Sequence, residues 1–295
     1  MTRTKGVQRP YRSALYLPAS NSRAIDKARA IDADAIIFDL EDAVAPQAKP
    51  AARENLIKGF AEGSFGRSCR VLRINQIDTP YFADDLAILE HCEVEAVLVP
   101  KVSSGENAAA IAARIAALSL PYNPGIWAMI ETPEALVNLS EIAGVGQAGE
   151  PRLECLVVGT NDIAKETGVS TAHDRTYLIP WLMNIVLIAR RFDLKVLDGV
   201  WNDFRDMEGY EREVRQSRRM GFDGKTLIHP TQVDLANQVF APSEADVAEA
   251  RAIVDEFARP ENAGAGVINM SGKMVELLHL EMARRILEID AAIRG

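Results

Sequence analysis

Short apolar runs alternate with helical patterns eight times along this chain of 295 residues. The strands we expect from these runs lie at residues 13–19, 35–38, 70–75, 96–101, 125–132, 155–160, 195–200 and 224–230. Continuous apolar runs of this length are typical of strands that are covered on both faces. Strict strand–helix alternation without a break in composition predicts a (β/α)8 TIM barrel, a fold of the α/β class. A doubly wound sheet is the alternative, but it would not need eight regular units.

The end of the chain looks like an addition to this barrel. We expect the barrel to occupy residues 1–240 and a C-terminal helical lid segment to occupy residues 241–295. Residues 262–272 are glycine-rich and low in apolar content, which predicts a loop that is mobile until substrate binds. A closing helix is expected at residues 273–293.

Charge and composition exclude several classes of protein. The net charge of −9 argues against a nucleic-acid-binding face, because neutralising phosphates needs a basic surface. The three cysteines show no CxxC spacing, so neither a disulfide framework nor a structural zinc site is indicated. The basic start has no apolar run behind it, and no run approaches the roughly 20 residues of a membrane span. We therefore expect a cytoplasmic protein.

Ionisable side chains recur where the expected strands end. They are Asp39, Glu41, Asp42, Arg73, Lys101, Glu131, Asp162, Asp198 and His229. A buried strand cannot hold unpaired charges in its middle, but its carboxyl end can present them to a ligand. In a (β/α)8 barrel all these ends face one mouth, where active sites lie. We therefore expect the ionisable side chains to converge there.

Two carboxylates from different strand ends, Glu131 and Asp162, favour a metal site. Together with the acids after the second strand they would repel one another unless a cation lay among them. Oxygen ligands without nearby histidine or cysteine suit a hard ion, Mg²⁺ or Mn²⁺. Arg73 and Lys101 would then serve an anionic or carbonyl-bearing substrate.

Bland alternatives exist for three of these residues. Lys101 can equally be a structural ion-pair partner, and Asp198, which precedes Gly199, can simply fix a turn. His229 can be a positioned loop histidine rather than a catalytic one.

Several motifs resemble one known family. RSALYLPAS, IIFDLEDAVAP, VLRIN, MIETPEALVN, VVGTNDIAKE and GFDGKTLIHP, in this order and spacing, are similar to the citrate lyase β-subunit-like enzymes of the HpcH/HpaI aldolase superfamily. That group includes malyl-CoA and citramalyl-CoA lyases and a (3S)-malyl-CoA thioesterase branch. The resemblance covers about residues 12–285 and is greatest to the thioesterase branch, chiefly through residues 196–230 and the late GKMVELLHL.

The resemblance implies roles for particular residues. It implies Mg²⁺ held by Glu131 and Asp162, with waters braced by the acids of the FDLEDAV motif, Asp39, Glu41 and Asp42. It implies that Arg73 contacts the carbonyl or carboxylate oxygens of the substrate. Arg23 and Lys27 match positions that touch CoA phosphates, and His229 and Pro230 are further candidates for binding the substrate or CoA. A homotrimer or hexamer is implied, with the C-terminal segment reaching a neighbouring active site.

We expect a lyase that cleaves a malyl-CoA-type 3-hydroxyacyl-CoA into acetyl-CoA and a 2-oxo acid. A positive group near the thioester oxygen, best supplied by Arg73, would stabilise the enolate. The alternative is a thioesterase that hydrolyses the same ester. The late segment carries Glu276 where many lyases of the family have aspartate, and the longer side chain can address a different proton or water.

Two rivals come from other classes. One is a non-catalytic scaffold barrel, and the other is a metal-dependent aldolase that acts on 4-hydroxy-2-oxo acids without CoA. Glu276 at the start of an exposed helix would also have no catalytic role.

Overall fold

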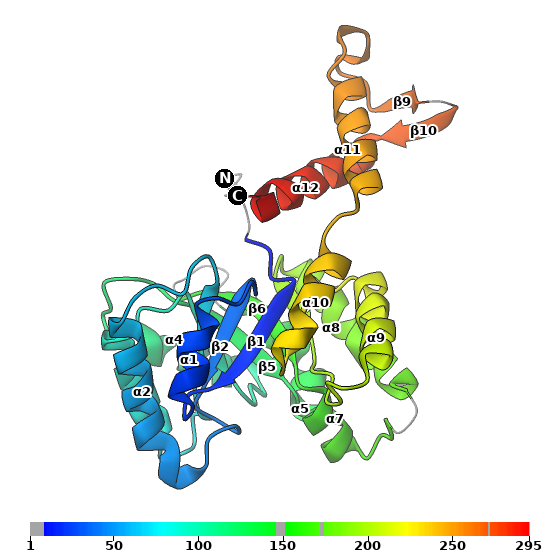
Figure 1. Cartoon of the computed structure of the whole chain (residues 1–295). Helices are drawn as coiled ribbons and strands as arrows, with labels where there is room; N and C mark the ends of the chain where they lie inside the picture. The colour runs from blue at the N-terminus through cyan, green and yellow to red at the C-terminus, as the bar shows by residue number, and fades with distance from the viewer. Residues whose placement is uncertain (1–8, 146–150, 172–173, 271, 295) are drawn as a thin grey trace. The chain divides into compact units, whose positions relative to one another are not determined.

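The predicted barrel is present. The computed structural model describes residues 9–145, 151–171, 174–270 and 272–294. Eight strands pair in chain order, each parallel to its neighbours, and β8 pairs with β1 to close the barrel (Figure 1). They are β1 Ser13–Pro18, β2 Ala35–Asp39, β3 Cys69–Arg73, β4 Ala96–Val99, β5 Gly125–Ile130, β6 Leu153–Val158, β7 Lys195–Asp198 and β8 Gly224–Leu227.

Helices follow the strands and lie outside the barrel. They are α1 Ser22–Ala28, α2 Lys49–Ala61, α3 Phe82–Ala87, α4 Gly105–Ala116, α5 Pro133–Val137, α6 Leu139–Gly144, α7 Thr160–Thr167, α8 Ile179–Arg191, α9 Met207–Met220 and α10 Val233–Phe240. Short 3₁₀ turns occur at η1 Pro46–Ala48, η2 Ile88–Glu90, η3 Thr176–Leu178 and η4 Pro230–Gln232. Local sequence fixes several helix starts: the Thr132 hydroxyl accepts a hydrogen bond from the N–H of Ala135, and Pro133 follows it at the first helical position.

Helix α7 was not predicted. The sequence predicts that Thr160 ends the sixth strand and that the next helix lies at residues 176–192, which contain η3 and α8. In α7 only Ile163 is buried, so the apolar periodicity that reveals a packed helix is almost missing. The consequence matters for function, because Asp162 lies in the first turn of this helix and not in a loop.

The strands are buried on both faces, as their apolar runs predict. Every residue of β2, β4 and β5 is buried. Inside the barrel, small residues such as Ala14 and Ala35 pack beside the large ring of Trp127. Tyr11 meets that ring edge-on at 4.9 Å between centroids. Burying each large apolar side chain contributes about 1.5–3 kcal/mol, so this interior is the main source of the stability of the barrel.

Strand register places the carboxylate at the end of two strands beside a cation on the next strand. Asp39 of β2 is paired with Arg73 of β3, and Asp198 of β7 is paired with Lys225 of β8. Register partners in neighbouring parallel strands point to the same face of the sheet. Each carboxylate therefore lies beside a cation without any long-range adjustment of the chain.

The chain divides into two compact units, and residues 11–237 form the barrel unit. The second unit contains the end of α10, helix α11 Glu244–Phe257, the turn η5 Pro260–Asn262, strands β9 Val267–Met270 and β10 Lys273–Glu276, and helix α12 Leu277–Arg294. Within it α11 packs against α12, and β9 pairs antiparallel with β10 (Figure 1).

The predicted closing helix was wrong at its start. Helix α12 begins at Leu277, four residues later than predicted, because residues 273–276 form β10. The segment expected to be a loop also contains β9. Ile268 and Val275 are register partners in this hairpin and are both buried, so pairing and burial of two apolar side chains outweigh local helical preference. No helix in the described part of the chain is long and apolar enough to cross a membrane.

Candidate active site

A cavity of about 390 Å³ lies at the carboxyl ends of the strands. Four of the predicted site residues line it, namely Asp39, Asp42, Arg73 and Asp162. Its wall contains residues within β1, β3 and β5 and residues within or directly after β2, β6, β7 and β8. The structure thus brings together side chains that are more than 120 residues apart in sequence, as convergence on one mouth predicts.

Arg73 is held by two carboxylates. Its Nε and Nη2 donate to the two oxygens of Asp39 at 2.7 and 2.5 Å, and its Nη1 forms an ion pair with Glu41 Oε2 at 2.7 Å. The geometry of the Glu41 contact does not make a hydrogen bond, so Glu41 Oε2 is a buried oxygen without a donor among the described residues. Backbone N–H groups of Glu41 and Ala43 donate to Asp39 and fix the turn after β2. This bidentate grip positions the guanidinium in the cavity wall.

Tyr16 of β1 is a site residue that the sequence pattern does not predict. The Arg73 guanidinium lies 4.7 Å from the centre of the Tyr16 ring, a cation–π contact. The Tyr16 hydroxyl is buried and has no hydrogen-bond partner among the described residues, and Tyr16 lines the cavity. Burial raises the pKa of this phenol, and Arg73 lowers it only in part. The hydroxyl is therefore a neutral donor that the protein leaves unused.

Glu131, directly after β5, is held by an unusual neighbour. It is 3% exposed, and its Oε1 accepts a hydrogen bond from the backbone N–H of Lys101 at 2.8 Å. Lys101 has φ = 52°, in the left-handed region that residues other than glycine seldom adopt. Gly159 is needed opposite, since a Cβ there would lie 2.4 Å from the Cβ of Glu131. The chain thus accepts backbone strain and a glycine in order to place this one carboxylate.

Too much negative charge gathers around Arg73. We call Arg73, Asp39, Glu41 and Glu131 the Arg73 cluster, in which one guanidinium faces three carboxylates. Burial raises the pKa of Glu131 to about 8, with contributions from Glu41 and Asp162, while the Lys101 N–H and Arg73 lower it. Burial likewise raises the pKa of Glu41 to about 7, against the opposing effect of Arg73. A further cation bound nearby would stabilise the charged form of these buried carboxylates, which repel one another.

The available ligands fit Mg²⁺. Glu131 and Asp162 come from neighbouring strand ends, and Asp162 is half-buried in the wall of the cavity. Within the described ranges, no three His, Cys, Asp or Glu side chains form a group that could hold a metal ion. Two carboxylates without a third suit an ion that keeps several waters and accepts substrate oxygens, as Mg²⁺ does. These oxygen donors do not form the closed site with nitrogen or sulfur ligands that a softer metal prefers.

The remaining predicted residues lie away from the cavity wall. Arg23 and Lys27 are exposed on α1. The ring of His229 stacks on that of Phe204 at 4.6 Å, and its Nδ1 lies 2.8 Å from the Thr231 hydroxyl at the start of η4. Pro230 is the exposed first residue of that turn. Their roles in binding CoA or the acyl group stay predictions.

Glu276 belongs to the second unit. It is the last residue of β10 and is half-buried, and its N–H donates to His279 Nδ1 at 3.0 Å. The alternative placing of Glu276 at the start of an exposed helix is wrong, because the helix begins one residue later. Its proximity to any active site stays a prediction.

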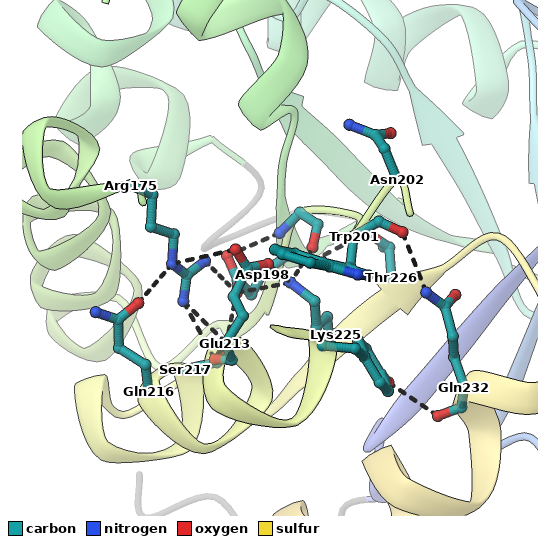
Figure 2. A network of polar contacts seen from close by, with 12 residues as sticks. Arg175, Asp198, Trp201, Asn202, Glu213, Gln216, Ser217, Lys225, Thr226 and Gln232 are labelled. Carbon is teal, nitrogen blue, oxygen red and sulfur yellow. Dashed lines mark hydrogen bonds and ion pairs between the residues drawn. The ribbon is translucent and has the colours of Figure 1, made fainter. Parts of the chain in front are cut away.

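Asp198 does much more than fix a turn. It accepts a hydrogen bond from the N–H of Gly199, but it is fully buried and also binds Lys225 at 3.0 Å and Arg175 at 2.6 Å (Figure 2). Lys225 reaches Glu213 at 2.7 Å as well. We call Asp198, Lys225, Arg175 and Glu213 the Asp198 cluster. Although burial alone would raise it, the pKa of Asp198 is held well below its usual range by Lys225 and Arg175.

Comparison with known proteins places these geometries in a family. Residues 12–230 match the family described as HpcH/HpaI aldolase/citrate lyase. The chain is 44% identical over 284 residues to a (3S)-malyl-CoA thioesterase of Cereibacter sphaeroides, with 96% of each chain covered. It is 32% identical over 302 residues to an L-malyl-CoA/β-methylmalyl-CoA lyase of Cereibacter sphaeroides, with 94% of each covered.

Solved structures of proteins described as CitE or citrate lyase β subunit are similar to this chain in fold. The CitE protein of Mycobacterium tuberculosis, in complex with magnesium, acetoacetate and coenzyme A, aligns with a TM-score of 0.75 and 29% identity. The alignment covers 96% of this chain and 98% of that one. The citrate lyase β subunit of the same organism, with oxaloacetate and magnesium, aligns over 80% of this chain with a TM-score of 0.67 and 29% identity. The chain belongs to the HpcH/HpaI aldolase/citrate lyase family.

Proposed function

We propose that this protein is a Mg²⁺-dependent thioesterase that hydrolyses a malyl-CoA-type 3-hydroxyacyl-CoA ester. The observation that carries the proposal is the meeting of Arg73, Glu131 and Asp162 at one mouth, beside a cavity of about 390 Å³. Similarity over nearly the whole chain supports the substrate and favours hydrolysis, since identity is 44% to a thioesterase and 32% to a lyase. An intact site argues against a scaffold barrel, and the CoA-acting relatives argue against an aldolase that does not use CoA.

Glu131 and Asp162 would hold the metal, and Mg²⁺ bound there would supply positive charge to the carboxylate and hydroxyl oxygens of the substrate. Mn²⁺ prefers the same oxygen ligands and is an alternative. Lys101 fixes Glu131 through its N–H, so this carboxylate needs little reorganisation on binding. Asp39 and Glu41 hold Arg73 in place for the substrate.

Hydrolysis adds water to the thioester carbonyl carbon, breaks the C–S bond and releases malate and the CoA thiol. Negative charge develops on the carbonyl oxygen as water attacks, and a fixed guanidinium stabilises it. Arg73 supplies that group, and the Tyr16 hydroxyl is available as a second donor beside it. Asp42, an exposed carboxylate in the cavity wall, is a candidate base for the water.

Cleavage of the C–C bond is the second candidate, and the lyases among the relatives favour it. The same grip on the substrate serves both reactions. In cleavage the hydroxyl proton is lost, the bond between the carbinol carbon and the α-carbon breaks, and acetyl-CoA and glyoxylate form. Arg73 would then stabilise the enolate instead of the tetrahedral oxyanion.

Separate assays of the products test the proposal. The purified protein is incubated with malyl-CoA and Mg²⁺, and malate, free thiol and glyoxylate are each measured. We expect malate and thiol in equal amounts with little glyoxylate. Glyoxylate as the main product would establish the lyase reaction. If neither malate nor glyoxylate forms, both proposed reactions are rejected.

Glu276 is the residue that we propose to influence the choice between the two reactions. This requires an oligomer, a trimer or hexamer, in which the second unit of one copy supplies Glu276 to the mouth of another. Glu276→Asp restores the residue common among the lyases, so the ratio of glyoxylate to malate should rise. An unchanged ratio and turnover would remove Glu276 from the active site.

A further inference from the structure

A second cavity shares a wall with the substrate cavity. Its volume is about 290 Å³. Thr160, Asn161, Val200 and Asn202 line both cavities. These four residues come from the start of α7 and from the segment after β7. The second cavity extends from there to Arg175 and Trp201.

One part of this shared wall is formed by the side-chain amides of Asn161 and Asn202. Asn161 Nδ2 donates to Asn202 Oδ1 at 3.1 Å, and Asn202 Nδ2 donates to Asn161 Oδ1 at 2.8 Å. Both residues are exposed. Hydrogen bonds between neutral groups that also face water contribute little net stability, so this bridge can be removed without loss of the fold.

The part of the shared wall at Thr160 is rigid. Thr160 lies against Gly199 so closely that a Cβ on Gly199 would be 2.6 Å from the Thr160 hydroxyl. The carbonyl of Asp198 accepts a hydrogen bond from Thr226 at 3.0 Å, and that of Gly199 accepts one from Lys225. Gln232 donates to the carbonyl of Trp201 at 3.1 Å (Figure 2). The Asp198 cluster therefore anchors the base of the wall and leaves the amide bridge as the part that can open.

The wall stands next to the carboxylates. Asp162 directly follows Asn161 in the first turn of α7, and Gly159, which Glu131 covers, precedes Thr160. The acid portion of a substrate bound at Glu131 and Asp162 would lie beside this wall. A substituent on that portion that points toward the second cavity would meet the bridge, because Asn161 and Asn202 line both cavities.

We propose that the Asn161–Asn202 bridge is a specificity-determining partition that limits the size of the acid portion of the substrate. This inference rests on the proposed function, because that function places the acid at Glu131 and Asp162. With the bridge intact, a short acid fits. The second cavity is lined by Leu178, Val200 and Trp201 as well as by charged residues. With the bridge removed, an aliphatic substituent of several carbons can lie against these three residues.

Binding of 2-oxo acids of different length tests the partition. Glyoxylate and 2-oxohexanoate are titrated in the presence of Mg²⁺ into the wild-type protein, Asn202→Ala, Asn161→Ala and the double variant, by calorimetry. We expect the wild type to prefer glyoxylate. Each single variant should shift the affinity ratio toward 2-oxohexanoate by about tenfold, since about 1.4 kcal/mol corresponds to that factor and a few buried methylenes supply it. The double variant should add nothing, because either substitution breaks the same bridge.

Asn138→Ala is the matched control. Asn138 donates to the Ser103 carbonyl at 2.9 Å and lines neither cavity, so its loss should leave the affinity ratio at the wild-type value. The same ratio in Asn202→Ala and wild type would overturn the proposal. So would equal binding of both acids, or of neither, by the wild type. Size selection without turnover of malyl-CoA would reject the proposed function alone, whereas turnover without size selection would reject the partition alone.

Discussion

Two buried charged clusters share one local arrangement, in which a carboxylate that ends a barrel strand is paired in register with a cation on the next strand. In the Arg73 cluster, Asp39 and Arg73 are register partners on β2 and β3. In the Asp198 cluster, Asp198 and Lys225 are register partners on β7 and β8. In each, the carboxylate is almost fully buried and binds two or more donors. Strand pairing alone therefore does not indicate which of the two clusters belongs to the active site.

The difference is in what surrounds each pair. The Asp198 cluster has two cations and two carboxylates, and Ser217 and Gln216 satisfy further donors and acceptors. The Arg73 cluster has one cation and three carboxylates, and an oxygen of Glu41 has no donor among the described residues. Beside it, Lys101 lowers the pKa of Glu41, but Asp42 and Asp162 raise the pKa values of Glu41 and Glu131, respectively, and the Tyr16 hydroxyl has no partner in the described part of the chain. A balanced and satisfied cluster holds a fold together. An unbalanced and unsatisfied cluster indicates a place for a ligand.

The largest expected effect comes from removing a carboxylate of the unbalanced cluster. Glu131→Gln should abolish turnover and the rise in melting temperature that Mg²⁺ produces. It should not lower the melting temperature of the metal-free protein, because the lost charge was opposed by burial and by like charges. Glu134→Gln, on the exposed face of α5, is the control and should keep both properties. Full turnover of chelator-treated wild type would contradict the metal assignment.

Breaking the balanced cluster should have the opposite signature. Lys225→Met leaves Asp198 with one cation fewer in a fully buried site, and such a change costs about 3–5 kcal/mol of folding free energy. Urea unfolding at pH 7 measures it. Mg²⁺ should still raise the melting temperature of this variant if it folds.

Measurements at acid pH test whether the loss of stability in Lys225→Met comes from the charge of Asp198. The low folded-state pKa of Asp198 means that its contribution to stability is present above its unfolded pKa and is lost as the pH falls through the folded value. The stability difference between Lys225→Met and the wild type should therefore shrink below about pH 4, where the unfolded carboxyl takes up its proton. A difference that is independent of pH would indicate a packing defect instead.

The sequence predicts one of these clusters far better than the other. Asp39, Glu41 and Asp42 follow a run of apolar residues, so their position at a strand end can be inferred from the chain alone. In the Asp198 cluster, Arg175 precedes η3 and Glu213 lies within α9. Nothing local links them to Asp198, because their contacts depend on how two segments pack against the barrel. Asp198 was for this reason expected to fix a turn.

Other misses have related causes. Tyr16 looks like a core residue in an apolar strand, and its role depends on the Arg73 side chain above its ring. The role of Lys101 comes from its backbone N–H and its positive φ, which no residue type reveals. The β9–β10 hairpin depends on pairing of two four-residue strands, a signal too short to outweigh the helical pattern that follows.

Arg73→Lys should sharpen the comparison inside the active cluster. An ammonium cannot make the bidentate contact with Asp39 and the ion pair with Glu41 at once, since it lacks the planar fork of the guanidinium. Turnover should fall by about 10²–10³, the usual effect of losing a donor to a developing oxyanion. Steady-state kinetics should show the loss in kcat more than in KM. Near-normal kcat would exclude a transition-state role for Arg73.

The smallest effect concerns the hydroxyl that the protein leaves unused. Tyr16→Phe keeps the ring under Arg73 and removes only a buried donor without a partner. Ligand-free stability should therefore stay the same or rise by up to about 1 kcal/mol. If the substrate supplies the missing acceptor, kcat/KM should fall by about tenfold, which is about 1.4 kcal/mol of transition-state stabilisation.

Tyr122→Phe separates this role from an ordinary structural one. The Tyr122 hydroxyl donates to the carbonyls of Leu89 and Cys92 at 2.7 and 3.0 Å, away from the cavity. Its loss should lower the free energy of unfolding by about 1 kcal/mol and leave kcat/KM unchanged. The two variants should thus behave in opposite ways, although each removes one oxygen atom. If Tyr16→Phe instead loses stability and keeps full activity, the Tyr16 hydroxyl is a structural donor, and the contrast between a satisfied and an unsatisfied cluster would rest on the excess of carboxylates alone.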